Sequence, residues 1–316
     1  MKSMRFKPYG GLEQMRLVNA PPPAPAQGQI LVEVAATSVN PVDWKLRSGM
    51  LRWITGMAGL PGIPCFDFAG QVKGLGGEVA DFAVGDRVFG MLSMRRLGAA
   101  TEHLVVDAAD AALLPASLDY KSAAGIPLAG MTALQALRDQ GGLAVGHRAL
   151  IIGASGGVGH YGVQIAKAMG AHVTGVCGSQ NVELVRSLGA NEIINYTRAD
   201  AGTVGEPFDV ILDSVMSLPF ARWRPHLSNR GVFVSLLPKP DHLLRAWTLP
   251  LHSQQRLRFT AVRPNRRDLG FLGDLAEQGK LKTVIDSVHP LEDLAAAMQK
   301  SQSGRARGKI IVSVID

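Results

Sequence analysis

The run GASGGVG at residues 153–159 constrains the fold more than any other feature of this chain. It directly follows the apolar segment RALII, and Val158, Gly162 and Ile165 then recur at helical spacing. A strand, a tight glycine turn and a helix in this order form the first unit of a parallel sheet that binds a dinucleotide. The run therefore predicts both a sheet and a ligand for it.

The spacing of the glycines in this run predicts a different structural role for each of them. Read from Ala154 it is an A-x-G-x-x-G form, in which Gly156 lets the backbone approach a pyrophosphate and Gly159 lets the helix pack closely on the strand. The start of the helix offers free N–H groups and a positive dipole end to the phosphates. A glycine-rich packing turn is the alternative. A Walker loop is excluded because no G-K-[ST] follows, and the hydrolase-like G-x-S-x-G at 153–157 leaves the flanking glycines unexplained.

The chain is long enough for two domains, because 316 residues exceed the size of one ordinary core. Its first third reads as short strands, at 30–39, 84–92 and 101–107, which suggests a small β-barrel or sandwich. Strands and helices then alternate, as is typical of a parallel sheet covered on both faces. The expected strands of that sheet are 148–152, 172–178, 192–196, 209–213 and 231–237, with a helix at 181–189. The last segment, GKIIVSVID, is a strand that can return to the first domain.

The end of the second strand indicates which nucleotide is bound. An NAD site usually carries Asp or Glu there to accept a hydrogen bond from the ribose 2′-OH, but this chain reads CGSQN at 177–181. Ser179, Gln180 and Asn181 can donate hydrogen bonds to a 2′-phosphate, which favours NADP(H) over NAD. None of them is charged, Arg186 lies too far along its helix to assign, and a plain loop role stays open for each polar residue.

Composition narrows the location and the partners. Two cysteines without a C-x-x-C cannot form a four-thiolate zinc site. No apolar run of transmembrane length and no signal peptide is found, so we expect a cytoplasmic protein without an integral membrane segment. The formal charge is +7, but the densest basic patch has little aromatic interleaving and no nucleic-acid module. We therefore expect a solvated basic face and no nucleic-acid partner; a phosphorylated cofactor is the next candidate. The patch comprises Arg256, Arg258, Arg263, Arg266 and Arg267.

Six segments run through most of the chain in a familiar order: SVNPVDWKLRSGMLR (38–52), IPLAGMTALQAL (126–137), GASGGVGHYGVQIAK (153–167), residues 171–196, GKLKTVIDSVHPL (279–291) and GRARGKIIV (304–312). Together they resemble the zinc-free quinone oxidoreductase branch of the medium-chain dehydrogenase/reductase superfamily. The resemblance implies an α/β chain with a GroES-like β-barrel domain, here 1–120 and 261–316. A Rossmann domain with a doubly wound parallel sheet is inserted at 121–260, and the cofactor lies in the cleft. Such proteins are dimers or monomers, so a homodimer stays open.

The resemblance also implies an activity and a set of contacts. The activity is NADPH-dependent hydride transfer to the C=C bond of enones or reactive carbonyls, or to quinones. The substrate would be a small hydrophobic carbonyl or quinone, with pocket walls from loops such as 49–62 and 238–250. Relatives often carry Arg or Lys where this chain has Gln180, which weakens the NADP preference. By match of motif, the cofactor contacts fall on Asn40, Thr132, Ser155, Gly157, Val158, Ser179, Tyr196, Ser214, Leu236, Arg305 and Arg307, beside Gly156, Gly159, Gln180 and Asn181.

We expect no metal. In zinc-dependent relatives the ligand-bearing segments correspond to VNPVDW, with Asn40 and Asp43, and to CFDFAG, with Cys65 and Asp67, and no His stands beside them. A catalytic zinc needs three placed ligands.

Without a Lewis acid, conjugate reduction is easier than reduction of a plain ketone, because charge develops as an enolate on an activated oxygen. Asn40 is the candidate that orders the nicotinamide ribose or donates to that oxygen, and Thr132 could place the nicotinamide ring. Lys45 could stabilise the enolate. Asp43 could accept from Lys45, cap the turn or act directly, and the proton can come from water. A nucleotide-binding sensor with little turnover and one-electron quinone reduction remain alternatives.

Overall fold

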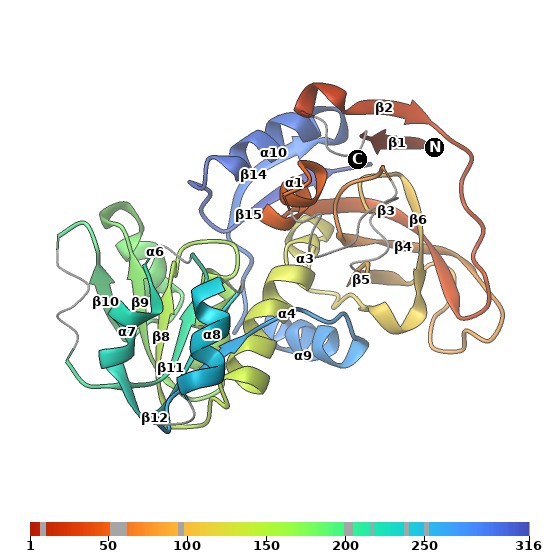
Figure 1. The fold of residues 1–316 in the computed structure, drawn as a ribbon. Coiled ribbons are helices and arrows are strands. Elements are labelled where there is room, and N and C mark those ends of the chain that lie inside the picture. The colour runs from red at the N-terminus through yellow and green to blue at the C-terminus, as the bar shows by residue number, and fades with distance from the viewer. Residues whose placement is uncertain are drawn as a thin grey trace. The chain divides into compact units, whose positions relative to one another are not determined.

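The computed structural model describes residues 1–6, 11–50, 62–93, 98–198, 205–215, 218–236, 240–249 and 253–315. The loops expected to wall the substrate pocket, 49–62 and 238–250, lie largely or partly outside these residues. The chain divides into two compact units (Figure 1). The first unit is Met1–Ala129, Arg263–Gly279 and Thr283–Asp316, and the second is Gly130–Val262 with Lys280–Lys282. The domain boundaries given above stay a prediction.

The first unit is built on a seven-stranded sheet. Its order is β14 (Ile285–Pro290), β15 (Lys309–Ser313), β3 (Gln29–Val39), β4 (Asp67–Leu75), β5 (Arg87–Met91) and β7 (Ala111–Leu113), and β6 (His103–Asp107) also pairs with β3. A separate antiparallel pair joins β1 (Lys2–Arg5) and β2 (Arg16–Asn19). The helices of this unit are α1 (Pro41–Arg47), α3 (Tyr120–Ala124), α9 (Arg266–Glu277) and α10 (Leu294–Gln302), with short 3-10 turns at Leu12–Gln14, Ala108–Asp110 and Leu291–Asp293.

The C-terminal strand completes the sheet that the N-terminal strands begin. β15 runs antiparallel to β3, with Ile310 opposite Val39 and Val312 opposite Thr37. The strand is apolar at consecutive positions because Ile310, Ile311 and Val312 are all buried, as expected where both faces of a sheet are covered. The C-terminal strand thus belongs to the sheet of the first unit.

The second unit holds a six-stranded sheet whose neighbouring strands are all parallel. Its order is β10 (Glu192–Asn195), β9 (His172–Cys177), β8 (Arg148–Ile152), β11 (Phe208–Asp213), β12 (Leu227–Ser235) and β13 (Arg256–Phe259). The predicted Rossmann-like sheet is thus confirmed. β13 was not predicted, because Arg256 and Arg258 in its sequence RLRF were assigned to a basic surface patch. The helical segments are the π-helix η3 (Ala136–Gln140), α5 (Gly159–Ala168), α6 (Val182–Ser187), α7 (Phe220–Trp223) and α8 (Pro240–Thr248), with 3-10 turns at Ser179–Asn181 and Arg224–His226; α4 (Pro127–Gln135) crosses the unit boundary.

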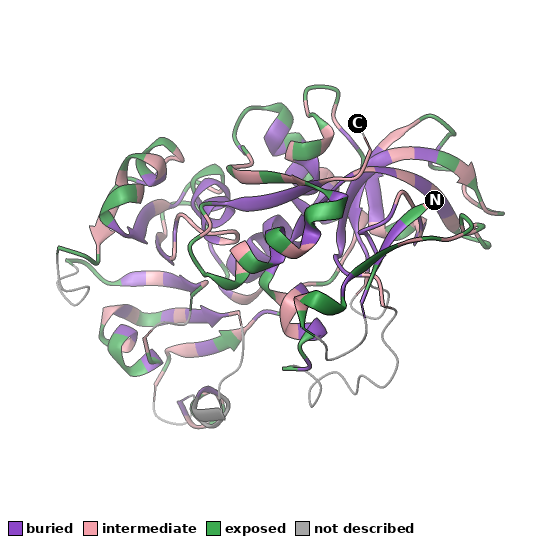
Figure 2. Cartoon of the chain, turned by 90° about the horizontal axis from the view of Figure 1, so that it is seen from above, coloured by how far each residue is buried: buried purple, intermediate pink, exposed green. Residues whose placement is uncertain are grey.

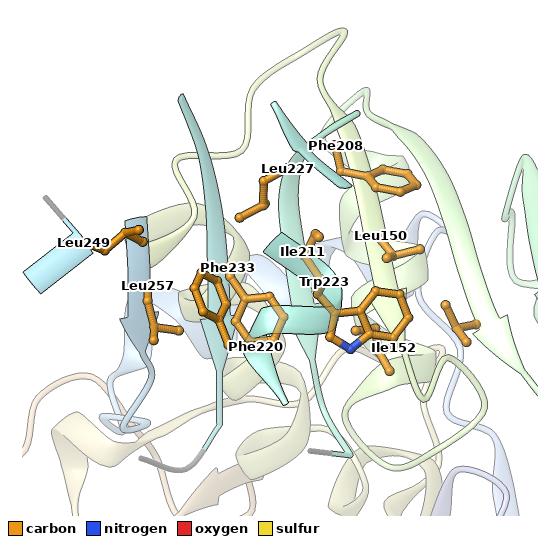
Figure 3. Close-up of a cluster of buried hydrophobic side chains, with 11 residues drawn as sticks. Leu150, Ile152, Phe208, Ile211, Phe220, Trp223, Leu227, Phe233, Leu249 and Leu257 are labelled. Atoms are coloured by element: carbon orange, nitrogen blue, oxygen red, sulfur yellow. The ribbon is translucent and has the colours of Figure 1, made fainter. Parts of the chain in front are cut away.

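Alternate residues of the central strands pack against helices on opposite faces of this sheet. On one face α5 lies so close that a Cβ added at Gly162 would sit 3.2 Å from Leu212 and 3.4 Å from Ile151. On the other face Leu150 and Ile152 pack with Trp223 of α7 (Figure 3). The sheet is therefore covered on both sides, which is why its strands read as unbroken apolar runs.

The hydrophobic cluster on the α7 face of the sheet also contains an aromatic pair. The rings of Phe220 and Phe233 meet edge to face, with centroids 5.3 Å apart, a geometry worth about 0.5–1.5 kcal/mol beyond the buried area. Figure 2 shows that burial concentrates in the strands, whereas exposed residues lie on outer helix faces and in loops.

The basic patch was expected to be one solvated face, but two of its arginines contact other parts of the protein. The guanidinium of Arg266 donates to Asp81 at 2.6 Å and to the backbone oxygens of Ala108 and Ala111, and it lies over the ring of Phe82. Arg256 donates to two backbone oxygens of its own loop. These two arginines therefore have structural partners. None of the helices in the described ranges has the length and apolar character needed to cross a bilayer.

Candidate functional site

The carboxyl edge of the parallel sheet gathers most of the predicted cofactor contacts. The strand order reverses between β8 and β11, which makes this edge the topological switch point where α/β sheets bind ligands. One predicted contact follows the end of each of five strands: Ser155 after β8, Ser179 after β9, Tyr196 after β10, Ser214 after β11 and Leu236 after β12.

The glycine turn between β8 and α5 needs glycine at both ends. Gly153 has a φ of +77°, and a Cβ there would lie 2.1 Å from Val215 and 2.7 Å from the Ser214 hydroxyl. At Gly159 an added Cβ would lie 2.0 Å from the Gly153 carbonyl oxygen and 2.9 Å from the Ala154 Cα. Both clashes at Gly159 are with backbone, so the first turn of the helix rests directly on the strand end.

Gly156 lies in different surroundings. An added Cβ there would meet only the Gly153 carbonyl oxygen, at 3.3 Å. The described residues therefore leave the space above Gly156 unfilled. This is what a close approach by a ligand requires.

Backbone donors of the turn point to the class of ligand. The Gly156 N–H donates to Gly153 at 2.9 Å, but the N–H groups of Ser155, Gly157 and Val158 find no acceptor in the part of the chain that the structure describes. They stand at the start of the ten-residue helix α5. Free donors combined with the positive end of a helix dipole form a site for phosphate.

The segment after β9 borders a hollow that the sequence did not reveal. Ser179 and Gln180 are exposed, and the Asn181 side-chain oxygen is buried without a partner among the described residues. The hollow measures about 470 Å³ and is lined by Ser179, Val182, Glu183, Arg186, Ile193, Asn195 and Arg198. Two guanidinium groups thus stand near a segment that itself carries no charge, and that of Arg186 pairs with the Glu183 carboxylate at 2.6 Å. Arg186 was left unassigned because of its place along the helix, and Arg198 follows the neighbouring strand, so no local pattern pointed to it.

A second polar cluster lies inside the first unit, where β3 ends and α1 begins. Pro41 opens α1, as is common at this position. Asn40 precedes it, and its backbone N–H donates to Asp43 Oδ2 at 2.6 Å. Asp43 therefore caps the turn, which was one of the roles left open for it, and no hydrogen bond or ion pair to Lys45 is found within the described ranges.

The Asp43 carboxyl is poorly solvated. The residue is 2% exposed, and its Oδ1 has no hydrogen-bond partner among the described residues. Burial raises the pKa of Asp43 to about 8, against the lowering effect of the Asn40 N–H. The side chain is thus largely protonated at neutral pH. Lys45 is half-buried with its ammonium 5.5 Å from the centroid of the Trp44 ring, and burial lowers the pKa of Lys45.

Two residues that were not among the predicted contacts complete this cluster. Asp67, fully buried at the start of β4, accepts from Asn40 Nδ2 at 2.7 Å. Lys309, 2% exposed at the start of β15, donates to Asn40 Oδ1 at 2.5 Å and lies 3.6 Å from Asp67 Oδ2. Asp67 had been considered only as a metal ligand. Lys309 was only part of the predicted C-terminal strand GKIIVSVID, and no local pattern places it beside a residue 269 positions away.

The donor set of this cluster does not fit a zinc ion. Within the described ranges, no group of three or more His, Cys, Asp and Glu side chains is placed to hold a metal. Asn40 and Asp67 both face the Lys309 ammonium, which occupies the position beside their oxygens. Burial raises the pKa of Cys65 well above its usual range, so this thiol is disfavoured as a thiolate ligand.

The remaining predicted contacts lie on other elements of the two units. Thr132 is buried on α4 in the second unit. Arg305 and Arg307 are exposed on the loop before β15 in the first unit, where the Arg307 N–H donates to Asp286. Their roles, like those of all the predicted contacts, stay predictions.

Comparison with known proteins places these features in a family. Residues 26–116 match the alcohol dehydrogenase GroES-like domain, and residues 188–312 match the zinc-binding dehydrogenase family. The chain is 37% identical to the chloroplast envelope quinone oxidoreductase homolog of Arabidopsis thaliana over 99% of this chain and 98% of that one. It superimposes on the quinone oxidoreductase of Coxiella burnetii with a TM-score of 0.89 and 28% identity, covering 100% and 99% of the two chains. The NADPH complex of Escherichia coli quinone oxidoreductase gives a TM-score of 0.85 with 26% identity, covering 99% of this chain and 100% of that one.

Proposed function

The chain belongs to the quinone oxidoreductases of the medium-chain dehydrogenase/reductase superfamily, and on that premise we propose that it transfers hydride from NADPH to the C=C bond of small hydrophobic enones or to quinones, without a metal. The observation that carries the proposal is the glycine turn after β8. Among the described residues, three backbone N–H groups of this turn have no acceptor, and an added Cβ at Gly156 would contact only the Gly153 oxygen. A diphosphate bridge is the ligand that such a turn suits best.

Two features support NADPH over NADH. The residues directly after β9, at 178–181, include no carboxylate to accept from a ribose 2′-OH, and Glu183 of the adjoining hollow is paired with Arg186. Arg198 lines the adjoining hollow and could supply the positive charge that Gln180 lacks, whereas Arg186 is paired with Glu183. A relative of known structure, the Escherichia coli quinone oxidoreductase, has been crystallised with NADPH.

The reduced nicotinamide cofactor would supply the hydride. In this proposal Asn40 orders the nicotinamide ribose or donates its free side-chain N–H to the carbonyl oxygen that becomes an enolate, and Thr132 positions the nicotinamide ring. Asp43 holds the turn that carries Asn40, because its Oδ2 accepts the Asn40 backbone N–H. The carboxyl is almost fully buried, so we assign the proton of the product to water.

The test is steady-state oxidation of NADPH and of NADH with 1-octen-3-one and a panel of quinones. We expect turnover with NADPH and two-electron products. Semiquinone products would instead indicate one-electron chemistry. Tight NADPH binding without turnover on any acceptor would refute the enzyme and favour a nucleotide-binding sensor.

A matched pair of glycine variants separates binding from folding. Gly156→Leu should abolish NADPH binding in a fluorescence titration, because its side chain would enter the space for the pyrophosphate. Gly77→Leu introduces the same side chain where an added Cβ meets nothing within 4 Å, and it should leave binding unchanged. NADPH affinity that is equal in the two variants would rule out the glycine turn as the site.

Arg198 can be tested separately from the glycine turn. Arg198→Ala should weaken NADPH binding about ten-fold or more while leaving NADH binding unchanged, because only NADPH carries the 2′-phosphate. Arg230→Ala is the control, since Arg230 is exposed and donates to Gln254 on the same unit. An equal loss for both nucleotides would show that Arg198 does not recognise the 2′-phosphate.

A further inference from the structure

A buried lysine sits where the fold family would lead one to expect a metal. Lys309 is 2% exposed, and its Nζ lies 2.5 Å from Asn40 Oδ1 and 3.6 Å from Asp67 Oδ2. Removing an ammonium group from water is costly unless the group is paired and hydrogen-bonded. The two contacts offset part of that cost, although burial still lowers the pKa of Lys309.

Asp67 is held by donors from several directions. Its Oδ2 accepts from the Ser38 hydroxyl at 2.5 Å and from Asn40 Nδ2 at 2.7 Å, and its Oδ1 accepts from the Leu128 N–H at 2.7 Å. A carboxylate bound in this way cannot rotate without breaking several hydrogen bonds. Asp67 is therefore a fixed anion beside the ammonium group of Lys309.

These partners determine which way the Asn40 amide faces. A lysine ammonium can only donate and a carboxylate can only accept. The amide oxygen of Asn40 must therefore face Lys309 and its nitrogen must face Asp67. One of the two Nδ2 hydrogens is used by Asp67, and the second finds no acceptor among the described residues. The cluster thus leaves one oriented donor.

We propose that Lys309 is a positioning residue that holds the Asn40 amide in one orientation. Its ammonium, paired with Asp67, takes the place of a metal ion as the buried cation of the first unit. In this orientation the Asn40 amide keeps one N–H for an oxygen of the substrate or cofactor. The inference rests on the proposed function only for the use of that N–H. The closed contact between Lys309, Asn40 and Asp67 exists whether or not the chain reduces enones.

The experiment compares wild type with the double variant K309M/D67N, in which the ion pair becomes a neutral pair of similar size. Lys309→Met alone would leave a buried unpaired carboxylate and could unfold the unit. The control is K300M, which removes the ammonium from the more exposed Lys300–Asp286 pair of the same unit.

We expect the double variant to remain folded by thermal melting and to bind NADPH with unchanged affinity. Its kcat should fall about ten-fold or more, because a misoriented donor no longer stabilises the developing charge, while KM changes little. K300M should match the wild type in all four measurements. A folded double variant with the kcat of wild type would overturn the proposal.

A second readout does not depend on turnover. In the wild type, hydrogen exchange of the Asn40 side-chain amide, followed by NMR, should show one strongly protected proton, and the double variant should lose that protection by ten-fold or more. If the protection is equal in both proteins, Lys309 and Asp67 do not hold the amide. If the wild type shows the protection and yet reduces no acceptor, the proposed function fails while the positioning by Lys309 stands.

Discussion

Replacing Asp43 by Asn should remove a specific pH dependence from the stability of the protein. Burial raises the pKa of the Asp43 carboxyl from 3.8 to about 8. The folded chain therefore carries one more proton than the unfolded chain between about pH 4 and pH 8. The stabilising contribution of the protonated carboxyl is complete below pH 4 and is lost as the pH rises towards 8.

The size of this change in the free energy of unfolding follows from the linkage between proton binding and folding. Each pH unit inside this window lowers the free energy of unfolding of wild type, relative to Asp43→Asn, by about 1.4 kcal/mol. From pH 5 to pH 7 the difference between the two proteins should therefore change by about 3 kcal/mol in favour of the variant. The carboxamide keeps an oxygen for the Asn40 N–H and does not ionise, so other titrating groups cancel in the comparison.

The assay is urea unfolding at half-unit pH steps. Asp286→Asn is the control, because Asp286 makes the free energy of unfolding depend on pH in the opposite direction. Burial works to raise the pKa of Asp286, but the Arg307 N–H and Lys300 outweigh it, so this pKa lies below its usual value. The stabilising contribution of Asp286 is present above about pH 4 and is lost on acidification. A constant difference between wild type and Asp43→Asn from pH 5 to pH 7 would refute the reasoning, since it would mean that Asp43 is ionised in the fold.

Three further outcomes are expected. Gly159→Ala should lower the melting temperature in calorimetry by an amount equivalent to about 1–3 kcal/mol, because its Cβ would lie 2.0 Å from the Gly153 oxygen; unchanged melting would contradict the close contact. Gln180→Arg should lower KM for NADPH but not for NADH, and an equal effect on both would remove the assignment of that loop. Phe220→Ala should cost about 3–5 kcal/mol in denaturant unfolding, because the side chain is 1% exposed and packs on Phe233; a cost below about 1 kcal/mol would be incompatible with that packing.

The parallel sheet and its glycine turn could be predicted to a large extent from the sequence. The GASGGVG run, the apolar strand before it and the alternation after it specify a parallel sheet through local rules of turn geometry and periodicity. Ser155, Ser179 and Ser214, which are among the predicted contacts, each come within three residues after the end of a strand, and parallel strands end at one edge. Their common location therefore needed no long-range information.

Only the tertiary structure decided the composition of the buried polar cluster. Lys309 meets Asn40 across 269 residues because β15 pairs with β3 in one register, and no local pattern encodes that meeting. Arg198 borders the hollow beside Ser179 because β10 pairs with β9. Turns and periodic faces follow from neighbouring residues in the chain, whereas the partner of a buried charge follows from strand pairing and packing, which join residues that the sequence holds far apart.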